Sequence, residues 1–126
     1  MAAPSSLSRV RGLGSAKEAT AHWWAQRLTS IALVPLTIWF AVSALSLIGA
    51  DLASFRAWLG EHGNSLLMVL WVATLFHHAQ LGLRVIIEDY VHGESAKIAS
   101  LIAVKFLAVV LATSSVLAVL RVAFGS

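Results

Sequence analysis

Three long hydrophobic runs alternate with short polar segments along the chain. The runs cover residues 28–50, 65–87 and 98–124. A helix needs about 20 residues to cross the roughly 30 Å hydrocarbon core of a bilayer, and each run is long enough. The pattern therefore predicts an all-α membrane protein with three transmembrane helices.

The segment between the first two runs carries a weaker helical signal of its own. Phe55, Trp58 and Leu59 follow one another at helical spacing, which predicts a short helix at the membrane surface. Pro35, inside the first run, predicts a gentle kink. Tryptophans just before the first run and in the first loop are typical of the aromatic belt at headgroup level: Trp23, Trp24 and Trp58.

Composition supports the membrane interpretation. Hydrophobic residues make up 59% of the chain and charged residues only 12%, which departs strongly from an ordinary soluble domain. The chain has no cysteine, so it cannot hold a disulfide or an iron–sulfur cluster by itself. We expect lipid and protein partners, and no nucleic acid.

Positive charge near the helix ends predicts the orientation. Residues 1–27 hold four of the nine Lys and Arg and lack the apolar core of a signal peptide. We therefore expect a retained cytoplasmic N-terminal segment, residues 1–27, followed by a three-helix membrane anchor, residues 28–126. The C-terminus is then periplasmic. Glu18 argues against a transit peptide, which favours a bacterial inner membrane over a mitochondrial one.

Two adjacent histidines, His77 and His78, lie just past the middle of the second run. An imidazole at this depth is costly unless something binds it. Neighbouring helical residues point about 100° apart, so the two cannot face the same partner. From His78, helical steps lead to Gly82 and then to Asp89 on one narrow stripe. A glycine there would leave room for a large flat ligand such as haem.

A haem with two axial imidazoles would need a second ligand from elsewhere. The other histidines, His22, His62 and His92, all lie outside the hydrophobic runs. A partner subunit or a second copy would then be required. The alternative for His77 or His78 is a hydrogen bond to a neighbouring helix without any cofactor.

Asp89 and Tyr90 lie where the second run meets the predicted cytoplasmic interface. A phenol can donate a hydrogen bond to a carbonyl oxygen, and a neighbouring carboxylate can orient it or handle a proton. This combination suits a quinone head group, which takes up two protons upon reduction. The alternative is an interfacial tyrosine beside exposed acidic side chains.

The chain resembles the small hydrophobic membrane-anchor subunit of succinate dehydrogenase in its alphaproteobacterial and mitochondrial form. Two stretches carry the resemblance, HAQLGLRVIIEDYVH at residues 78–92 and HWWAQRLTSIAL at residues 22–33, together with the three runs. The resemblance extends from Gly12 to the end. It implies a complex of a flavoprotein subunit, an iron–sulfur subunit and two membrane anchors that share one haem b and form a ubiquinone site. It implies no catalytic centre for succinate oxidation in this chain.

The resemblance also implies roles for individual residues. His78 matches the axial ligand of the haem iron, with the other ligand given by the larger, cytochrome b anchor subunit. Tyr90 matches the residue that hydrogen-bonds a ubiquinone carbonyl, and Asp89 matches its acidic neighbour. Arg27 matches an arginine near the haem propionates and the quinone pocket, and His22 matches the histidine before it.

Several alternatives stay open. Because His77 directly precedes the matched position, the assignment of the ligand depends on helix register, and we favour His78 because it shares a stripe with Asp89. The chain could instead be an anchor, or cytochrome b subunit, of a fumarate reductase or another quinone-linked complex. A different class of function is a small homo-oligomeric transporter in which Lys105, His77 and Arg84 line a polar path.

Overall fold

The structure, a computed structural model, describes residues 13–125. These residues form four helices, α2 (Leu13–Ser46), α3 (Leu52–Gly60), α4 (His62–Tyr90) and α5 (Glu94–Ala123). The described part of the chain contains no strand. Three of the helices are long and apolar enough to cross a membrane, over Lys17–Ser46, His62–Tyr90 and Glu94–Ala123. The prediction of an all-α protein with three candidate spans is confirmed.

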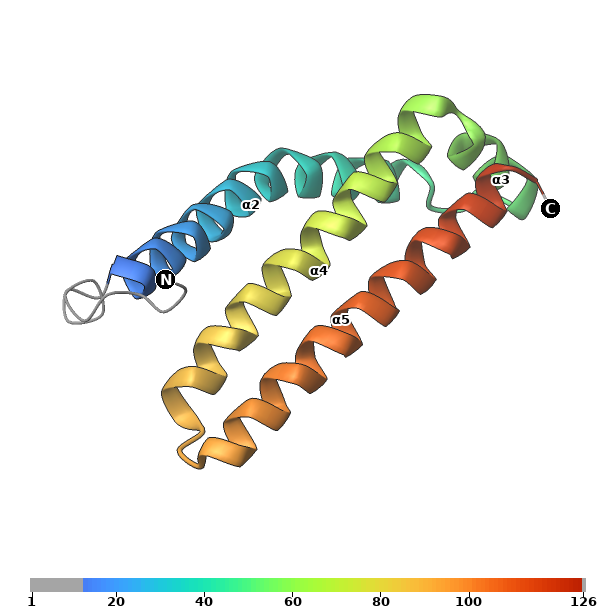
Figure 1. Ribbon diagram of the computed structural model, residues 1–126. Coiled ribbons are helices and arrows are strands. Elements are labelled where there is room, and N and C mark those ends of the chain that lie inside the picture. The colour runs from blue at the N-terminus through green and yellow to red at the C-terminus, as the bar shows by residue number, and fades with distance from the viewer. Residues whose placement is uncertain (1–12, 126) are drawn as a thin grey trace, which may run out of the picture.

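α4 is the central helix of the arrangement. It packs against α2 and against α5, whereas α2 and α5 make no packing contact with each other in the described residues. Figure 1 shows α4 and α5 running side by side, and α2 diverging from α4 toward its own N-terminal end. A space that opens between α2 and α4 at this end is therefore flanked by two helices only.

α2 is longer than the hydrophobic run that predicts it. It begins at Leu13, so the described part of the polar N-terminal segment is helical and continuous with the first candidate span. Between residues 15 and 27 the chain contains neither glycine nor proline, and alanine and long side chains propagate a helix well. Pro35 lies inside α2, and the ribbon changes direction part way along this helix (Figure 1).

The predicted short helix is present as α3, and its residues Phe55, Trp58 and Leu59 are partly or fully buried. Asp51 caps the helix by accepting a hydrogen bond from the Ser54 backbone N–H at 2.8 Å. Hydrogen bonds from Ser54, first from its side chain and then from its backbone, lower the pKa of Asp51. Leu59 is buried, and the Trp58 ring stacks on Trp39 of α2 with 5.9 Å between centroids. These contacts tie α3 to the transmembrane helices.

Aromatic packing holds α2 and α4 together at their crossing. The rings of Phe40 and Trp71 stack with 4.0 Å between centroids. The Trp71 indole N–H also donates a hydrogen bond to the Thr37 hydroxyl oxygen, with 3.2 Å between Nε1 and Oγ1. The crossing is thus fixed far from the end of α2 where the helices diverge.

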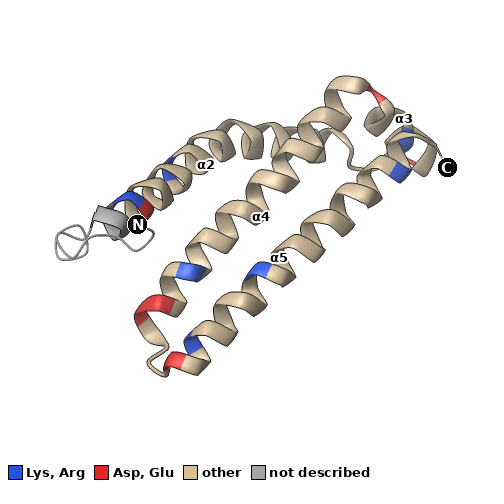
Figure 2. Ribbon diagram, in the orientation of Figure 1, with Lys and Arg blue, Asp and Glu red and all other residues tan. Residues whose placement is uncertain are grey.

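Most of the apolar surface faces outward. In the described residues, only Leu59, Val72, Leu81 and Ile87 are buried hydrophobic side chains. The middle of each long helix is largely uncharged, and most charges lie near helix ends (Figure 2). A continuous apolar surface of this extent needs lipid or another protein against it.

Candidate functional site

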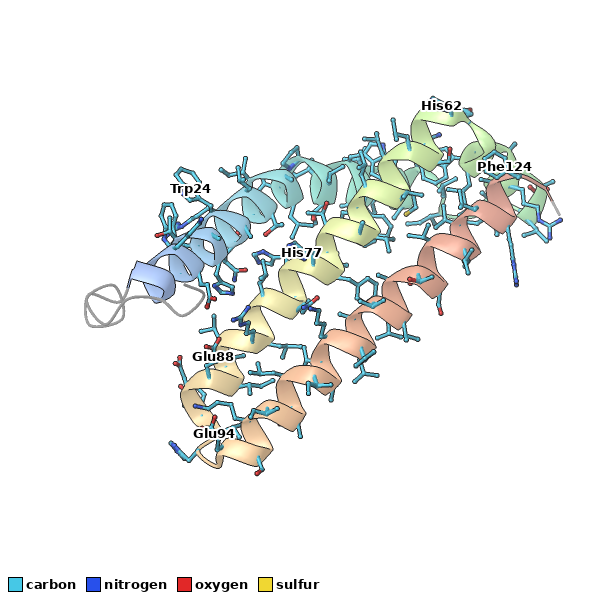
Figure 3. The ribbon with its side chains drawn as sticks, viewed as in Figure 1. Trp24, His62, His77, Glu88, Glu94 and Phe124 are labelled. Carbon is cyan, nitrogen blue, oxygen red and sulfur yellow. The ribbon has the colours of Figure 1, made fainter. Side chains whose placement is uncertain are left out.

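The divergence of α2 from α4 creates a pocket of about 600 Å³. One wall comes from the N-terminal half of α2 and the other from the last two turns of α4, and side chains of both helices project into the space between them (Figure 3). The lining residues are Glu18, Ala19, His22, Trp23, Gln26, Arg84, Val85, Glu88 and Asp89. The pocket therefore combines acidic, basic and amide side chains beside an apolar protein surface.

His78 contacts α2 outside this pocket, closer to the middle of α4 than the pocket residues. Its Nδ1 lies 2.9 Å from the Thr29 hydroxyl oxygen, and both side chains are partly buried. No hydrogen bond in the described residues uses the Nε2 atom of His78. The contact is the hydrogen bond to a neighbouring helix that the sequence left open, and it occupies only one ring nitrogen. His77 is exposed.

Gly82 lies one turn closer to the pocket on the same stripe. A Cβ atom at this position would have the Gln26 side-chain nitrogen at 4.0 Å, an ordinary van der Waals distance. The stripe that runs from His78 through Gly82 to Asp89 therefore faces α2. The Gln26 side chain lies beside Gly82, where the sequence predicts room for a flat ligand such as haem.

Two polar atoms in the pocket wall lack partners. His22 Nε2 and Gln26 Oε1 are buried, and neither has a hydrogen-bond partner in the described residues. A buried polar atom left unsatisfied costs about 1–3 kcal/mol. A bound molecule with hydrogen-bonding groups would relieve this cost, so the α2 wall of the pocket is suited to a polar ligand.

Gln26 and Thr29 were missed as site residues in the sequence. The signal that could have found them is the spacing of His22, Gln26 and Thr29, which lie at i, i+4 and i+7 on one face of a helix. Ser30, one residue further, instead donates its hydroxyl to the Gln26 carbonyl oxygen at 2.8 Å. The polar face of α2 formed by His22, Gln26 and Thr29 therefore lies opposite the stripe of α4 that carries His78, Gly82 and Asp89.

The remaining predicted site residues are placed differently. Asp89 and His22 both line the pocket, whereas Arg27 and Tyr90 do not. The Arg27 guanidinium lies over the Trp23 ring, 5.1 Å from its centroid. Tyr90 is 74% exposed at the end of α4. The structure therefore brings together His22, Asp89 and the face that carries His78, and leaves Arg27 and Tyr90 on the outer surface.

The residues of the predicted polar path do not share one cavity. Arg84 forms an exposed ion pair with Glu88, with 3.2 Å between Nε and Oε1. Lys105 and Arg84 line a smaller pocket of about 270 Å³ between α4 and α5. His77 lines neither this pocket nor the one between α2 and α4. This placement gives the transporter hypothesis no support.

Comparison with known proteins gives consistent matches. Residues 1–112 match the family described as succinate dehydrogenase/fumarate reductase transmembrane subunit. A succinate dehydrogenase hydrophobic membrane anchor subunit of Paracoccus denitrificans is 34% identical over 117 residues, 93% of this chain and 90% of the relative. The corresponding subunit of Rickettsia bellii is 30% identical over 113 residues, 90% of each chain. A succinate dehydrogenase membrane anchor subunit of Reclinomonas americana is 32% identical over 97 residues, 74% of this chain and 80% of the relative. No solved structure gives a significant match.

Proposed function

The chain belongs to the family of succinate dehydrogenase/fumarate reductase transmembrane subunits, and on that premise we propose that it is a membrane anchor of succinate:ubiquinone oxidoreductase. The relatives named above are anchors of succinate dehydrogenase, which favours this direction of reaction over fumarate reduction. Three apolar helices with few buried side chains supply the outward surfaces that such an anchor presents to lipid and to partner subunits.

The observation that carries the cofactor proposal is the His78 imidazole, held through Nδ1 and with Nε2 in no hydrogen bond within the described residues. A neutral imidazole with one nitrogen held is the usual form of a metal-ligating histidine. His78 would hold the haem iron as one axial ligand, and the larger anchor subunit would give the second. A bound haem b would supply storage for one electron near the quinone site.

His22 and Arg27 are proposed to serve the haem propionates and the quinone pocket. Both lie on the N-terminal half of α2, one inside the pocket and one on the outer surface. A cationic or N–H donor group stabilises a carboxylate through a charge-assisted hydrogen bond. The unpaired Nε2 of His22 is a donor in one tautomer and is available for this purpose.

Ubiquinone is proposed to bind where the pocket meets the exposed end of α4. Asp89 lines the pocket, and Tyr90 follows it on the surface. The Tyr90 hydroxyl would donate a hydrogen bond to a quinone carbonyl, and Asp89 would deliver a proton as the quinone is reduced. Since Tyr90 is mostly exposed in this chain, the partner subunits would form the rest of the site.

Purification of the chain from its native membrane tests the whole proposal. We expect a flavoprotein, an iron–sulfur protein and a second membrane anchor to co-purify, with the reduced spectrum of a six-coordinate b-type haem. The preparation should reduce ubiquinone with succinate. A colourless assembly of this chain alone would contradict the proposal and favour the transporter hypothesis.

The proposed orientation has its own test. Because the chain contains no cysteine, an introduced cysteine is its single thiol. Both Ala57 on α3 and Ser95 at the start of α5 are exposed. With the N-terminus in the cytoplasm of a bacterial cell, a membrane-impermeant maleimide added from the periplasmic side should label Ala57→Cys. It should label Ser95→Cys only after the membrane is opened.

Val72→Cys is the negative control for this labelling, because Val72 is buried in α4. The reverse pattern, with Ser95→Cys labelled first, would place the N-terminus and the α2–α4 pocket on the periplasmic side. The measurement is the fraction of labelled chain in sealed vesicles of known sidedness.

A further inference from the structure

We propose that Thr29 is a positioning residue for His78, which fixes the imidazole tautomer so that Nε2 carries the free lone pair. The inference depends on the proposed function only for the identity of the ligand, a haem iron. The hydrogen-bonding pattern that carries it involves this chain alone. It assigns a role in cofactor binding to a hydroxyl group that otherwise reads as ordinary helix packing.

The Thr29 hydroxyl oxygen has three polar neighbours. It lies 2.7 Å from the Ala25 carbonyl oxygen, 3.1 Å from the Gln26 carbonyl oxygen and 2.9 Å from Nδ1 of His78. Carbonyl oxygens only accept hydrogen bonds, and a hydroxyl group has one proton to donate. The proton is therefore directed to the preceding turn of α2, toward Ala25 at the shorter distance.

This arrangement determines which imidazole nitrogen carries a proton. With its proton used, the Thr29 oxygen offers lone pairs to His78, so Nδ1 must be the donor. In a neutral imidazole the other nitrogen is then unprotonated, and Nε2 becomes the atom able to bind a metal. A histidine bound through Nε2 and held at Nδ1–H by an oxygen acceptor is the usual arrangement at metal sites.

Thr29 is suited to this task by its position and its shape. Its hydroxyl is held against the backbone of α2, so the acceptor is fixed relative to the helix rather than carried on a long flexible side chain. A β-branched side chain has few χ1 rotamers in a helix. The partner sits on α4, and the bond therefore also couples the ring orientation to the distance between the two helices.

The hydrogen bond should alter the iron chemistry in a predictable direction. An acceptor on Nδ1–H increases the basicity of Nε2, which stabilises ferric iron relative to ferrous iron. Removal of the acceptor should therefore raise the reduction potential of the haem. It should also weaken haem binding, because an oriented ligand is exchanged for a ring that is free to rotate.

The experiment compares three variants in the intact, haem-loaded complex. Thr29→Val keeps the shape and removes the acceptor, and Thr29→Ser restores it. Thr37→Val is the matched control, because Thr37 also accepts a hydrogen bond from α4 but from Trp71 rather than a histidine. The readouts are the haem midpoint potential by redox titration and the rate of haem transfer to an apo-globin.

We expect Thr29→Val to weaken haem binding about 10–100-fold, the usual range for an outer partner of a metal ligand. Its midpoint potential should rise, and each tenfold loss of ferric preference corresponds to about 59 mV. Thr29→Ser and Thr37→Val should both behave like the unaltered complex. Should Thr29→Val fail to assemble, Thr29→Ala replaces it in the same comparison.

Two results would overturn the role of Thr29. One is an unchanged potential and haem affinity in Thr29→Val. The other is an equal change in Thr29→Ser and Thr29→Val, which would indicate packing instead of hydrogen bonding. In either case His78→Ala should still lose haem if the proposed function is right. If His78→Ala keeps its haem with an unchanged spectrum, the ligand assignment itself is wrong.

Discussion

Replacement of His78 by alanine is expected to yield a complex without stably bound haem b. The reason is the loss of the proposed haem ligand, whose Nδ1 lies 2.9 Å from the Thr29 hydroxyl oxygen and whose Nε2 would bind the iron. Loss of an outer partner of a metal ligand already costs 10–100-fold in affinity, so loss of the ligand itself should cost at least about 100-fold. Haem content per complex, measured from the reduced-minus-oxidised spectrum, checks this expectation.

His77→Ala is the control for this variant. The two histidines are adjacent and lie at the same depth of α4, but His77 is exposed while His78 contacts α2. We therefore expect His77→Ala to retain haem with an unchanged spectrum. Loss of haem in His77→Ala, with retention in His78→Ala, would show that His77 and not His78 is the haem ligand.

Replacement of Asp89 by asparagine should lower the rate of ubiquinone reduction by roughly 10²-fold, the lower end of the contribution of a positioned general acid. Asparagine keeps the size of the side chain and removes the ionisable carboxyl group that would deliver the proton. Haem content should not change, because the proposed iron ligand His78 is held by Thr29 and not by Asp89. The measurement is succinate-driven reduction of a ubiquinone analogue.

Tyr90→Phe gives a smaller expected effect at the same site. The loss of one hydrogen bond to a quinone carbonyl is worth about 0.5–1.5 kcal/mol, which corresponds to a fall of up to about tenfold. Electron delivery from succinate to a water-soluble acceptor should remain normal in both variants, since the soluble subunits are intact. Glu94→Gln, which removes an exposed carboxylate outside the pocket, serves as the matched control. Normal ubiquinone reduction in Asp89→Asn and Tyr90→Phe would refute their proposed roles.

The three long helices could be predicted from the sequence because membrane spans leave a strong one-dimensional signal. The packing between them could not. Lipid-facing and protein-facing positions of a transmembrane helix are both apolar, so hydrophobic periodicity does not reveal which face of α2 meets α4. The start of α2 at Leu13 was also missed, because its first turns are helical without being hydrophobic.

The same distinction applies to the candidate site: features within one helix could be predicted, and contacts between helices could not. The stripe from His78 to Asp89 follows from helical geometry, and the structure turns that stripe toward α2 as one face. Gln26 and Thr29 could not be predicted as site residues, because their contacts with α4 depend on how the two helices pack. The roles of all five predicted site residues stay predictions. Among them, Arg27 and Tyr90 lie on surfaces that partner subunits would cover.

Among the described long helices, α2 packs against α4 and not against α5. The helix pair beside the proposed haem ligand therefore lacks a third wall, which a partner subunit would supply. If the proposed function holds, correct biogenesis would depend on balanced synthesis, because a copy made in excess of its companion polypeptides would keep this side of α2 uncovered.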